Sequence, residues 1–268
     1  MTTHTITLST DNRIDITVDE YGTGHPFLLL HGGAGSQSVT GLAQQLATSD
    51  HAHTYVPTHP GFGGTTRPDW LNSVRILAET YVALIEQLDL RDVTVIGSSI
   101  GGWIAAEMAL QASSRIRSFI LIDAAGITVE GQPVVDIFPL TMDELAKLSY
   151  HNPAAFRIDL AAMPDTQKRI MAANRQALAI YGGQPSMTDP TLRKRLGAIT
   201  APTLVLWGDS DGIVTPDYGR AYAAAIPTAT FQLLSNTGHL PQIETPDQVL
   251  TAIRNFVNVP AGKRPNTQ

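Results

Sequence analysis

The sequence predicts an α/β fold with a mostly parallel sheet of eight strands flanked by helices. Eight short segments have the residue pattern of strands, and segments with helical spacing of apolar residues lie between many of them. Six of the eight strand segments are short, mainly apolar runs rather than alternating ones. Such runs are typical of parallel strands, which helices cover on both faces.

The expected elements follow one another in a regular order. Two alternating strands, at residues 3–9 and 13–19, form an antiparallel pair around an Asp11-Asn12 turn. The buried strands are expected at residues 27–30, 54–57, 93–96, 119–122, 204–207 and 231–234. Helices are expected at residues 74–88, 100–111, 217–225 and 247–257, where each can cross over the sheet.

A long insertion interrupts this order after the sixth strand. Residues 127–198 separate two strands that a crossover of ~10–15 residues would connect. Their pattern is helical, most clearly at residues 142–150 and 165–181, and is broken by Pro139, Pro153, Pro164 and Pro185. We therefore expect a core formed by residues 1–126 and 199–259, a helical cap at residues 127–198, and a flexible tail at residues 260–268.

The composition excludes several classes of function. The 268 residues include 24 acidic and 18 basic ones, and the net charge of −6 does not suit binding to nucleic acid or to an anionic membrane. Because cysteine is absent, disulfides, thiolate metal sites and cysteine nucleophiles are excluded. The N-terminus lacks the pattern of a secretory signal, and no apolar run approaches the ~20 residues of a membrane span. We expect a soluble, cytoplasmic protein.

A G-x-S-x-G pattern with Ser99 at its centre follows the strand at residues 93–96. A nucleophile on a sharp turn from strand to helix crowds the residues two before and two after it, and glycine relieves both contacts. Gly97 and Gly101 occupy those positions around Ser99, whereas Ser98 has no such glycines. The turn also places Ser99 at a helix N-terminus, which favours developing negative charge. A serine that only caps the helix is the structural alternative.

A glycine-rich segment, H-G-G-A-G from His31 to Gly35, follows the strand at residues 27–30. Acyl transfer needs two backbone N–H donors directed at the tetrahedral oxyanion, and glycines let the backbone approach that oxygen. We assign these donors to Gly33 and Ile100, with Ala34 as the alternative to Gly33. A nucleotide-binding loop is disfavoured, since neither common glycine-rich nucleotide pattern is present.

His239, in N-T-G-H-L, lies in the loop after the last buried strand. At this place a histidine can serve as general base, because its unperturbed pKa near ~6.5 lets it accept a serine proton at neutral pH. A metal site at His51, His53 and His59 is disfavoured, and we expect these histidines on the surface or in loops.

Three carboxylates compete to orient this base. Asp211 and Asp209 follow the strand at residues 204–207, and Asp123 ends the strand at residues 119–122. All three fit the chain order serine, acid, histidine, so order does not discriminate. Asp209 stands directly at a strand end, where capping the next turn is a structural role. We therefore favour Asp211, with Asp209 and Asp123 as alternatives.

With these motifs in place, the chain resembles the α/β-hydrolase fold enzymes that have a serine nucleophile and a helical cap. The resemblance extends over residues 3–257. It includes H-G-G after the third strand, P-G-F-G at residues 60–63, G-x-S-x-G after the fifth strand, the G-D-S-D-G-I-V-x-P block after the seventh, and G-H with Glu244-x-Pro246 after the eighth. In family members with the G-x-x-D-x-[IV]-x-P block the acid is the D of that block, which implies Asp211 here.

Departures from the patterns of individual sub-families narrow the choice of sub-family. Haloalkane dehalogenases and epoxide hydrolases carry Asp where this chain has Ser99. The C–C bond hydrolases of aromatic degradation are similar in size and in the H-G-G start, but they usually have an aromatic residue where this chain has Leu240. Perhydrolase-type members often have Met at the position of Ile100.

A substrate is expected between Ser99 and the cap, because the active site of such a sheet opens at the carboxyl ends of the strands. Ala34 and Leu240 flank the predicted site in the sequence, and large apolar residues are candidates for the pocket walls. These are Phe62, Trp70, Trp103, Phe138, Phe156 and Tyr181.

These observations predict a serine hydrolase in which Ser99, His239 and Asp211 act together on a small carboxylic ester or lactone. Hydrolysis of a C–C bond in a β-diketone-like compound is the enzymatic alternative. A small-molecule receptor without catalysis on the same fold is the alternative from another class. We expect no metal and no organic cofactor, and a small ester-like molecule as the partner. The oligomeric state is left open.

Overall fold

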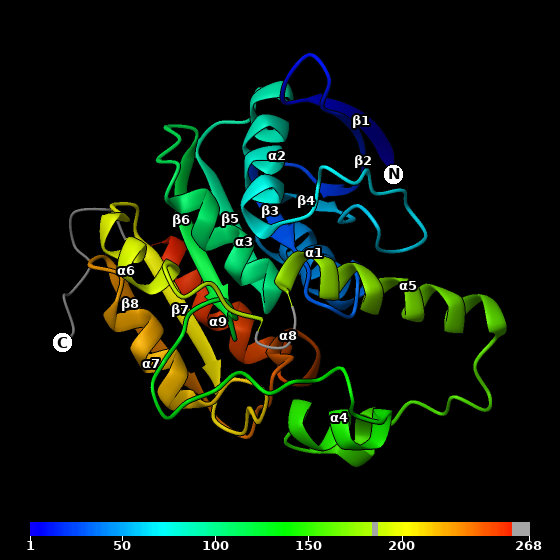
Figure 1. Cartoon of the computed structure of the whole chain (residues 1–268). Coiled ribbons are helices and arrows are strands. Elements are labelled where there is room, and N and C mark those ends of the chain that lie inside the picture. The colour runs from blue at the N-terminus through cyan, green and yellow to red at the C-terminus, as the bar shows by residue number, and fades with distance from the viewer. Residues whose placement is uncertain (184–186, 259–268) are drawn as a thin grey trace.

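The computed structural model describes residues 1–183 and 187–258, which contain an eight-stranded sheet in the order β1-β2-β4-β3-β5-β6-β7-β8 (Figure 1). β2 is antiparallel to β1 and to β4. The remaining neighbours are parallel. The prediction of a mostly parallel sheet with flanking helices is confirmed.

All eight expected strands are present, with longer or shifted ends. They are β1 Thr2–Thr7, β2 Arg13–Gly22, β3 His25–Leu30, β4 Ala52–Pro57, β5 Val93–Ser98, β6 Ile116–Ile122, β7 Thr203–Gly208 and β8 Ala229–Leu234. β6 begins earlier than its apolar run because polar residues are accommodated there. The Ser118 hydroxyl pairs with that of Thr94 at 3.2 Å, and Arg117 contacts Asp92 at 3.1 Å.

The two faces of the sheet carry separate hydrophobic cores. On β3, Leu28 and Leu30 belong to one core cluster, whereas Phe27 and Leu29 belong to the other. This division follows from the alternation of side chains along a strand. Because both faces of the central strands are buried, their sequences read as continuous apolar runs.

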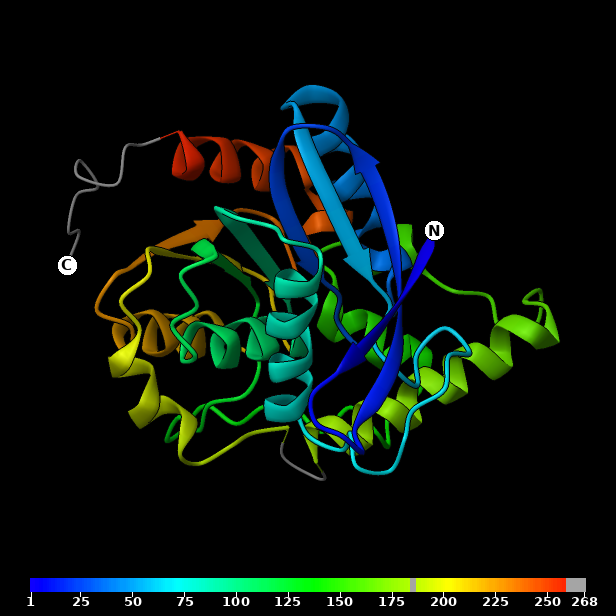
Figure 2. The ribbon, with the colours of Figure 1, turned by 90° about the horizontal axis from the view of Figure 1, so that it is seen from above.

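Helices cover both cores, as Figure 2 shows, with α1 and α9 on one face and α2, α3 and α7 on the other. The core helices are α1 Gln37–Ser49, α2 Val74–Gln87, α3 Ile100–Ala109, α7 Pro216–Ala224, α8 Pro241–Glu244 and α9 Pro246–Val257. Four of them match the expected ranges closely, and α8 is a short helix that follows His239. No helix among the described residues is both long enough and apolar enough to span a bilayer.

Helix α1 was not expected from the sequence. Its buried residues Val39, Leu42 and Leu46 have helical spacing, but Gly41 and several Ser and Thr residues lower the helix propensity of the segment. Packing of this apolar stripe against the sheet compensates for that weak propensity.

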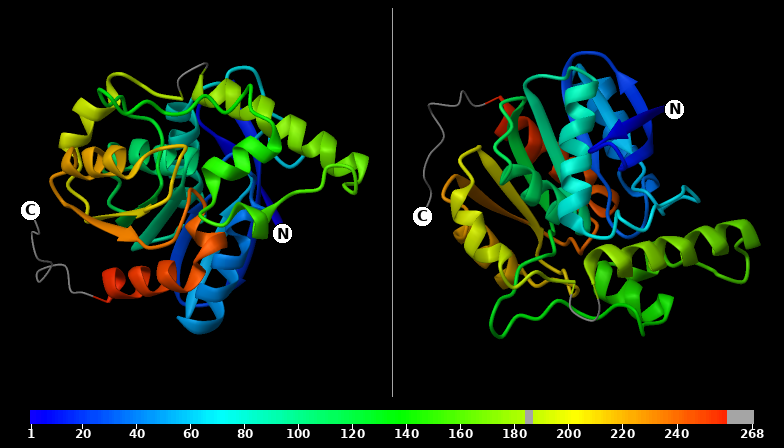
Figure 3. Two further views of the ribbon diagram at one scale, coloured as in Figure 1. Left: turned by 90° about the horizontal axis from the view of Figure 1, so that it is seen from below. Right: turned by 45° about the horizontal axis from the view of Figure 1, so that its top comes forward.

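Helices α4 Met142–Ser149 and α5 Asp165–Gly182 lie beyond the end of the sheet toward which β6 and β7 point, and α5 projects away from it (Figures 1 and 3). The described part of residues 127–198 also contains η1 Pro153–Phe156, α6 Leu192–Arg195 and η2 Leu196–Ala198. The two clearest predicted helices correspond to α4 and α5. Pro185 and the tail predicted at residues 260–268 lie outside the described residues.

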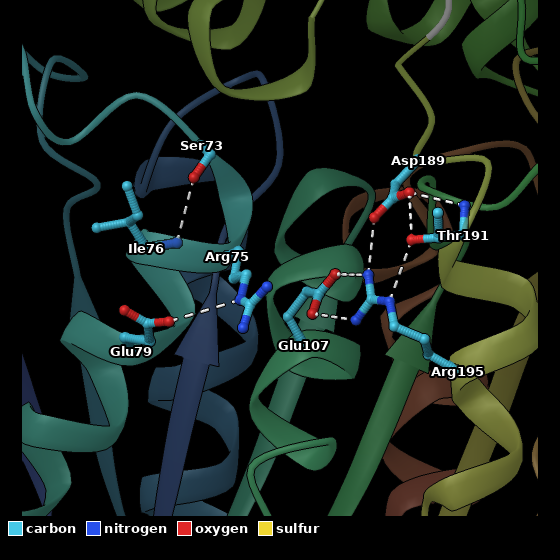
Figure 4. Close-up of polar contacts among 8 residues, drawn as sticks. All are labelled: Ser73, Arg75, Ile76, Glu79, Glu107, Asp189, Thr191 and Arg195. Carbon is cyan, nitrogen blue, oxygen red and sulfur yellow. Dashed lines mark hydrogen bonds and ion pairs between the residues drawn. The ribbon is translucent and has the colours of Figure 1, made fainter.

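Figure 4 shows polar contacts on α3, on the neighbouring α2 and at α6. Glu107 of α3 is buried and binds Arg195 of α6 through two hydrogen bonds of 2.6 and 2.8 Å. Arg195 also binds Asp189 at 2.7 Å. On α2, the Ser73 hydroxyl caps the helix by accepting the Ile76 amide. The ion network therefore joins the end of the insertion to α3.

Candidate active site

Ser99 occupies a strained turn between β5 and α3. Its φ of 57° and ψ of −119° are unusual for a residue with a side chain. A Cβ added to Gly97 would lie 2.1 Å from the Gly101 carbonyl oxygen, and one added to Gly101 would lie 2.2 Å from the Leu30 carbonyl oxygen. Both positions therefore require glycine, as the G-x-S-x-G pattern indicated.

Three side chains distant in the sequence form one chain of hydrogen bonds. His239 Nε2 lies 3.0 Å from the Ser99 hydroxyl, and His239 Nδ1 lies 2.8 Å from Asp211 Oδ2. Since a carboxylate only accepts, His239 donates from Nδ1, and its Nε2 lone pair is free to accept the Ser99 proton. Asp211 and His239 are buried, with 3% and 7% of their surfaces exposed.

The Asp211 carboxylate is fixed by the backbone of its own loop. Asp211 Oδ1 accepts the amides of Ile213 at 2.7 Å and Val214 at 3.1 Å. These bonds leave Oδ2 facing His239. The G-D-S-D-G-I-V segment thus orients the carboxylate by main-chain contacts as well as by its position after β7.

Asp209, one of the two competing acids, has a structural environment. It accepts the amides of Asn236 and Thr237 and the hydroxyl of Ser210. Burial acts to raise its pKa, but these hydrogen bonds outweigh burial and lower the pKa of Asp209. The carboxylate therefore holds the β8 loop to the end of β7, the turn-capping role considered from the sequence.

Asp123, the other competing acid, lies close to Asp211 and His239. Among the described residues, these three form the single group of side chains whose ligand-type atoms lie close enough to hold a metal ion, within 4.8 Å of one another. The Asp211–His239 hydrogen bond already uses two of the three side chains. The group is therefore a hydrogen-bonded pair of side chains with a second buried carboxyl group beside it.

The glycine-rich loop after β3 lies against Ser99. A Cβ on Gly32 would lie 3.1 Å from the Ser99 Cβ. Within the described residues the Gly33 and Ala34 amides donate to no protein acceptor. Ile100 is the first residue of α3, so its amide has no acceptor inside the helix. The amides at both predicted oxyanion positions, and that of the alternative Ala34, therefore have no acceptor in the described part of the protein.

Two buried histidines, His31 and His59, support this loop through hydrogen bonds. His59 Nε2 donates to the His31 carbonyl at 2.9 Å, and the His59 amide donates to His31 Nε2 at 3.0 Å. His59 Nδ1 pairs with the Tyr81 hydroxyl at 2.5 Å. Burial lowers the pKa of His31 to about 4 and that of His59 well below its ordinary value. Both rings are therefore neutral at neutral pH.

His59 lies in a loop, which is one of the two expected places, but its side chain is completely buried rather than at the surface. The two imidazole rings stack at 3.7 Å, so each covers the other from water. The place of His59 in the sequence could have indicated this burial, since His59 comes two residues after a buried strand, at the end of the sheet where the site forms.

Two expected wall residues pack close to the loops. Phe62 is fully buried and meets His31 edge-on at 5.0 Å, so it lies in the core rather than on an exposed wall. Tyr181 of α5 donates its hydroxyl to the Pro60 carbonyl at 2.9 Å. Both residues support the loops around Ser99.

Other expected wall residues have varied surroundings. Phe138 lies beneath the Arg175 guanidinium at 6.0 Å, and Phe156 stacks on Tyr150 at 4.5 Å. Trp70 is half-buried beside the main core. None of these contacts involves Ser99.

Trp103 and Leu240 are the expected pocket residues nearest the hydrogen-bonded chain. The Trp103 amide donates to the Ser99 carbonyl at 3.2 Å, and its buried indole N–H has no partner among the described residues. Leu240 is half-buried and directly follows His239.

The insertion meets the loops of the site in two places that the sequence analysis missed. Near α4, the His239 amide donates to the Ser149 carbonyl at 2.8 Å. Glu244 accepts amides from both sides of this junction, those of Gly238, His151 and Asn152. The His239 loop and the end of α4 are therefore held by one carboxylate.

Along α5, side chains one helical turn apart contact the other loops. Asn174 Oδ1 accepts the Gly63 amide at 2.8 Å. A Cβ on Gly33 would lie 2.8 Å from a methyl carbon of Leu178. With Tyr181, these residues form a stripe spaced by three and four, a signal that the sequence contained.

Comparison with known proteins agrees with this architecture. A family model described as alpha/beta hydrolase fold matches residues 25–246. A putative non-heme bromoperoxidase, BpoC, of Mycobacterium tuberculosis is 27% identical over 262 residues, covering 91% of this chain and 97% of that protein. A 2-hydroxymuconate semialdehyde hydrolase of Pseudomonas putida is 26% identical, covering 89% of each.

Solved structures have the same fold. A thermophilic esterase from Thermogutta terrifontis superimposes with a TM-score of 0.68 at 25% identity, covering 96% of this chain and 98% of that one. Since the family model spans most of the chain and the sheet order and the Ser99 turn are as described above, the chain belongs to the α/β-hydrolase fold family.

Proposed function

We propose that the protein is a serine hydrolase that cleaves a small carboxylic ester or lactone through an acyl-enzyme. The observation that carries this proposal is the continuous chain of hydrogen bonds from Ser99 through His239 to Asp211, with Ser99 on a strained turn at a helix N-terminus. This combination activates a hydroxyl and stabilises the negative charge that its attack creates.

In this mechanism the Ser99 oxygen attacks the substrate carbonyl carbon while His239 Nε2 takes the hydroxyl proton. Asp211 keeps the imidazole in the Nδ1–H tautomer and stabilises the imidazolium. The Gly33 and Ile100 amides donate to the tetrahedral oxyanion. His239 then protonates the leaving alcohol oxygen, and water, activated by the same histidine, releases the acid and restores Ser99.

Hydrolysis of a C–C bond is the second candidate. It is favoured by the similarity to the 2-hydroxymuconate semialdehyde hydrolase over nearly the whole of both chains. In that reaction a carbon, rather than an alkoxide oxygen, must leave and be protonated. Parallel assays with a short-chain ester, a lactone and a β-diketone-like compound would separate the two candidates by kcat/KM.

The test of the proposal is intact-protein mass after treatment with a small fluorophosphonate. We expect a single adduct on the natural chain, no adduct on Ser99→Ala, and a much slower reaction for His239→Ala. Ser98→Ala is the matched control, since it removes the adjacent hydroxyl and should keep the adduct. No adduct on the folded natural chain, or an adduct that survives Ser99→Ala, would overturn the proposal.

The choice of acid has its own test. Asp211→Asn should lower kcat by several orders of magnitude, because it stabilises the wrong tautomer of His239. Asp209→Asn should leave most of the activity, since the Asp209 carboxylate accepts its hydrogen bonds from the loop backbone and Ser210. The reverse result would show that Asp211 is not the acid.

A further inference from the structure

Asp123 is a buried carboxyl group that the proposed mechanism does not use. It follows β6 directly, has no exposed surface and adopts a left-handed φ of 44°. Because β6 pairs with β7, the Asp123 amide donates to Leu206 of β7, and its side chain comes beside the Asp211 loop. A titratable group in such a place needs a physical reason to be tolerated.

The two oxygens of Asp123 have different surroundings. Oδ1 accepts the Gly208 amide at 2.9 Å. Oδ2 is buried and has no hydrogen-bond partner in the described part of the chain. An ionised carboxylate with an unpartnered oxygen would be costly in this place. A protonated oxygen, in contrast, needs only one acceptor.

The neighbouring carboxylate offers that acceptor. Asp211 receives two amides at Oδ1 and the His239 ring at Oδ2. A carboxylate oxygen can accept two hydrogen bonds, so Oδ2 retains one free position. One oxygen each of Asp123 and Asp211 and one ring nitrogen of His239 lie within 4.8 Å of one another. Small adjustments of the side chains would bring the two carboxyl groups into contact.

The surroundings also indicate which carboxyl group holds the proton. Asp211 has three donors, one of which becomes an imidazolium during the proposed reaction, whereas Asp123 has one backbone donor. Two carboxylates this close in a buried site do not both ionise readily. Asp211, which has more hydrogen-bond donors, is the one that retains the negative charge.

We propose that Asp123 is a neutral carboxylic acid that donates its proton in a hydrogen bond to the Asp211 carboxylate, and that it is a positioning residue for the Asp211–His239 pair. This inference rests on the proposed function, in which Asp211 orients His239. The titratable groups that face Asp123 within the cluster are Asp211 and His239. The hydrogen bond would fix the carboxylate plane and make Asp211 a weaker base, so that the proton taken from Ser99 stays on His239.

The electrostatics of the site agree with this geometry. Burial, followed by the charge of Asp211, raises the pKa of Asp123 well above its usual range, and the Gly208 amide opposes that shift only in part. Asp123 therefore stays protonated at neutral pH, where the hydrolase would work.

Two substitutions separate a donor from a space-filling residue. Asp123→Asn keeps an acceptor for the Gly208 amide and an N–H donor for Asp211, whereas Asp123→Leu fills a similar volume with no donor. We expect kcat/KM of Asp123→Asn to stay within about threefold of the natural chain, and that of Asp123→Leu to fall at least about tenfold. The acid limb of the kcat/KM profile should move to higher pH in Asp123→Leu only, because an unshared Asp211 charge holds the imidazolium more strongly.

Infrared difference spectra give a readout that does not depend on activity. The natural chain minus Asp123→Asn should show the carbonyl stretch of a neutral carboxylic acid at pH 7. Asp209→Asn, which changes the aspartate at the end of the neighbouring strand, should leave that band in place. If Asp123→Leu does not fold, the infrared comparison still decides whether Asp123 is a neutral acid.

Absence of the Asp123-dependent band, or equal kinetic losses in Asp123→Asn and Asp123→Leu, would overturn the inference. The fluorophosphonate reaction at Ser99 tests the proposed function separately. A chain that forms the Ser99 adduct but lacks the infrared band would retain the function and refute the role of Asp123. A chain with the band but no adduct would do the opposite.

Discussion

Near α4 the insertion meets the His239 and Asp211 loops through main-chain groups, whereas along α5 it meets the glycine-rich loop and the loop at residues 60–63 through side chains. The Leu148 and Ser149 carbonyls accept the Gly212 and His239 amides at 2.9 and 2.8 Å. On the α5 side the contacts are made by Asn174, Leu178 and Tyr181. Two junctions of one insertion therefore depend on the sequence in different ways.

The difference has a physical consequence. Main-chain hydrogen bonds persist when side chains change, so the α4 junction keeps His239 in place over many sequences, with Glu244 as its main side-chain requirement. The α5 junction changes shape with each substitution, because its contacts are packed side chains. We therefore expect substitutions at α4 to affect the rate of the reaction and those at α5 to affect the fit of the substrate.

The largest expected effect concerns His31 and His59, the buried histidines that support the glycine-rich loop. In the folded chain burial lowers the pKa of His31 to about 4, whereas an unfolded histidine titrates near ~6.5. The unfolded state therefore binds more protons as pH falls from 6.5 toward 4. Folding stability decreases over that window, by about 3 kcal/mol for His31 alone. Buried Asp123 acts in the opposite direction, but it is one group against two.

Urea unfolding between pH 7 and pH 4.5 would measure this dependence. In His59→Gln the slope of stability against pH should fall by about 1.4 kcal/mol per pH unit, the value for one proton. His51→Gln, which changes an exposed histidine, should leave the slope unchanged. An unchanged slope in His59→Gln would show that the ring is not held neutral.

A similar loss of folding stability is expected where the ion network of Arg195 and Glu107 joins α6 to α3. Arg195→Met leaves the buried Glu107 without its cation and should lower the free energy of unfolding by about 3 kcal/mol. Arg75→Met is the matched control, since Arg75 pairs with Glu79 at 3.7 Å on the exposed face of α2 (Figure 4). That change should stay within about 0.5 kcal/mol. Equal effects in urea unfolding would contradict the difference in burial.

A smaller effect is expected from Glu244→Gln at the α4 junction. The amide retains one acceptor oxygen in place of two, so one of the three backbone donors loses its partner. We expect kcat to fall about tenfold with KM nearly unchanged, because the His239 loop shifts relative to Ser99. Glu144→Gln, at the capping box that begins α4, should leave kcat unchanged. A change in KM alone would place the effect on the substrate side.

The smallest effect is expected from Tyr181→Phe at the α5 junction. It removes the hydrogen bond to Pro60 and should cost about 1 kcal/mol of stability while raising KM more than it lowers kcat. Tyr222→Phe is the control, because the buried Tyr222 hydroxyl has no partner within the described residues. That variant should be neutral in unfolding and in kinetics. A kcat effect in Tyr181→Phe with KM unchanged would remove the distinction between the two junctions.

Much of the fold could be predicted because its determinants are local. Buried parallel strands appear as apolar runs in the sequence. The turn at Ser99 has no room for a Cβ atom at Gly97 or Gly101, so the two glycines in the segment 93–101 indicate this turn. The predicted ends of the elements were less accurate. In β6, for example, the polar Ser118 lies inside the strand because its hydroxyl pairs with that of Thr94 on β5. α1 was missed since its helix is stabilised by the sheet rather than by its own propensities.

By itself the sequence determined the α/β fold, the order of its strands and helices along the chain, and the places of Ser99, His239 and Asp211 at strand ends. Only the tertiary structure decided which of these groups meet. Through its tertiary contacts Asp209 holds the loop after β8 by accepting its backbone amides. Asp123 lies beside Asp211 because β6 and β7 are neighbours in the sheet. The tertiary structure also buried His59 beneath the glycine-rich loop. Strand pairing and loop packing are contacts between distant residues, and their energies are not properties of any local segment.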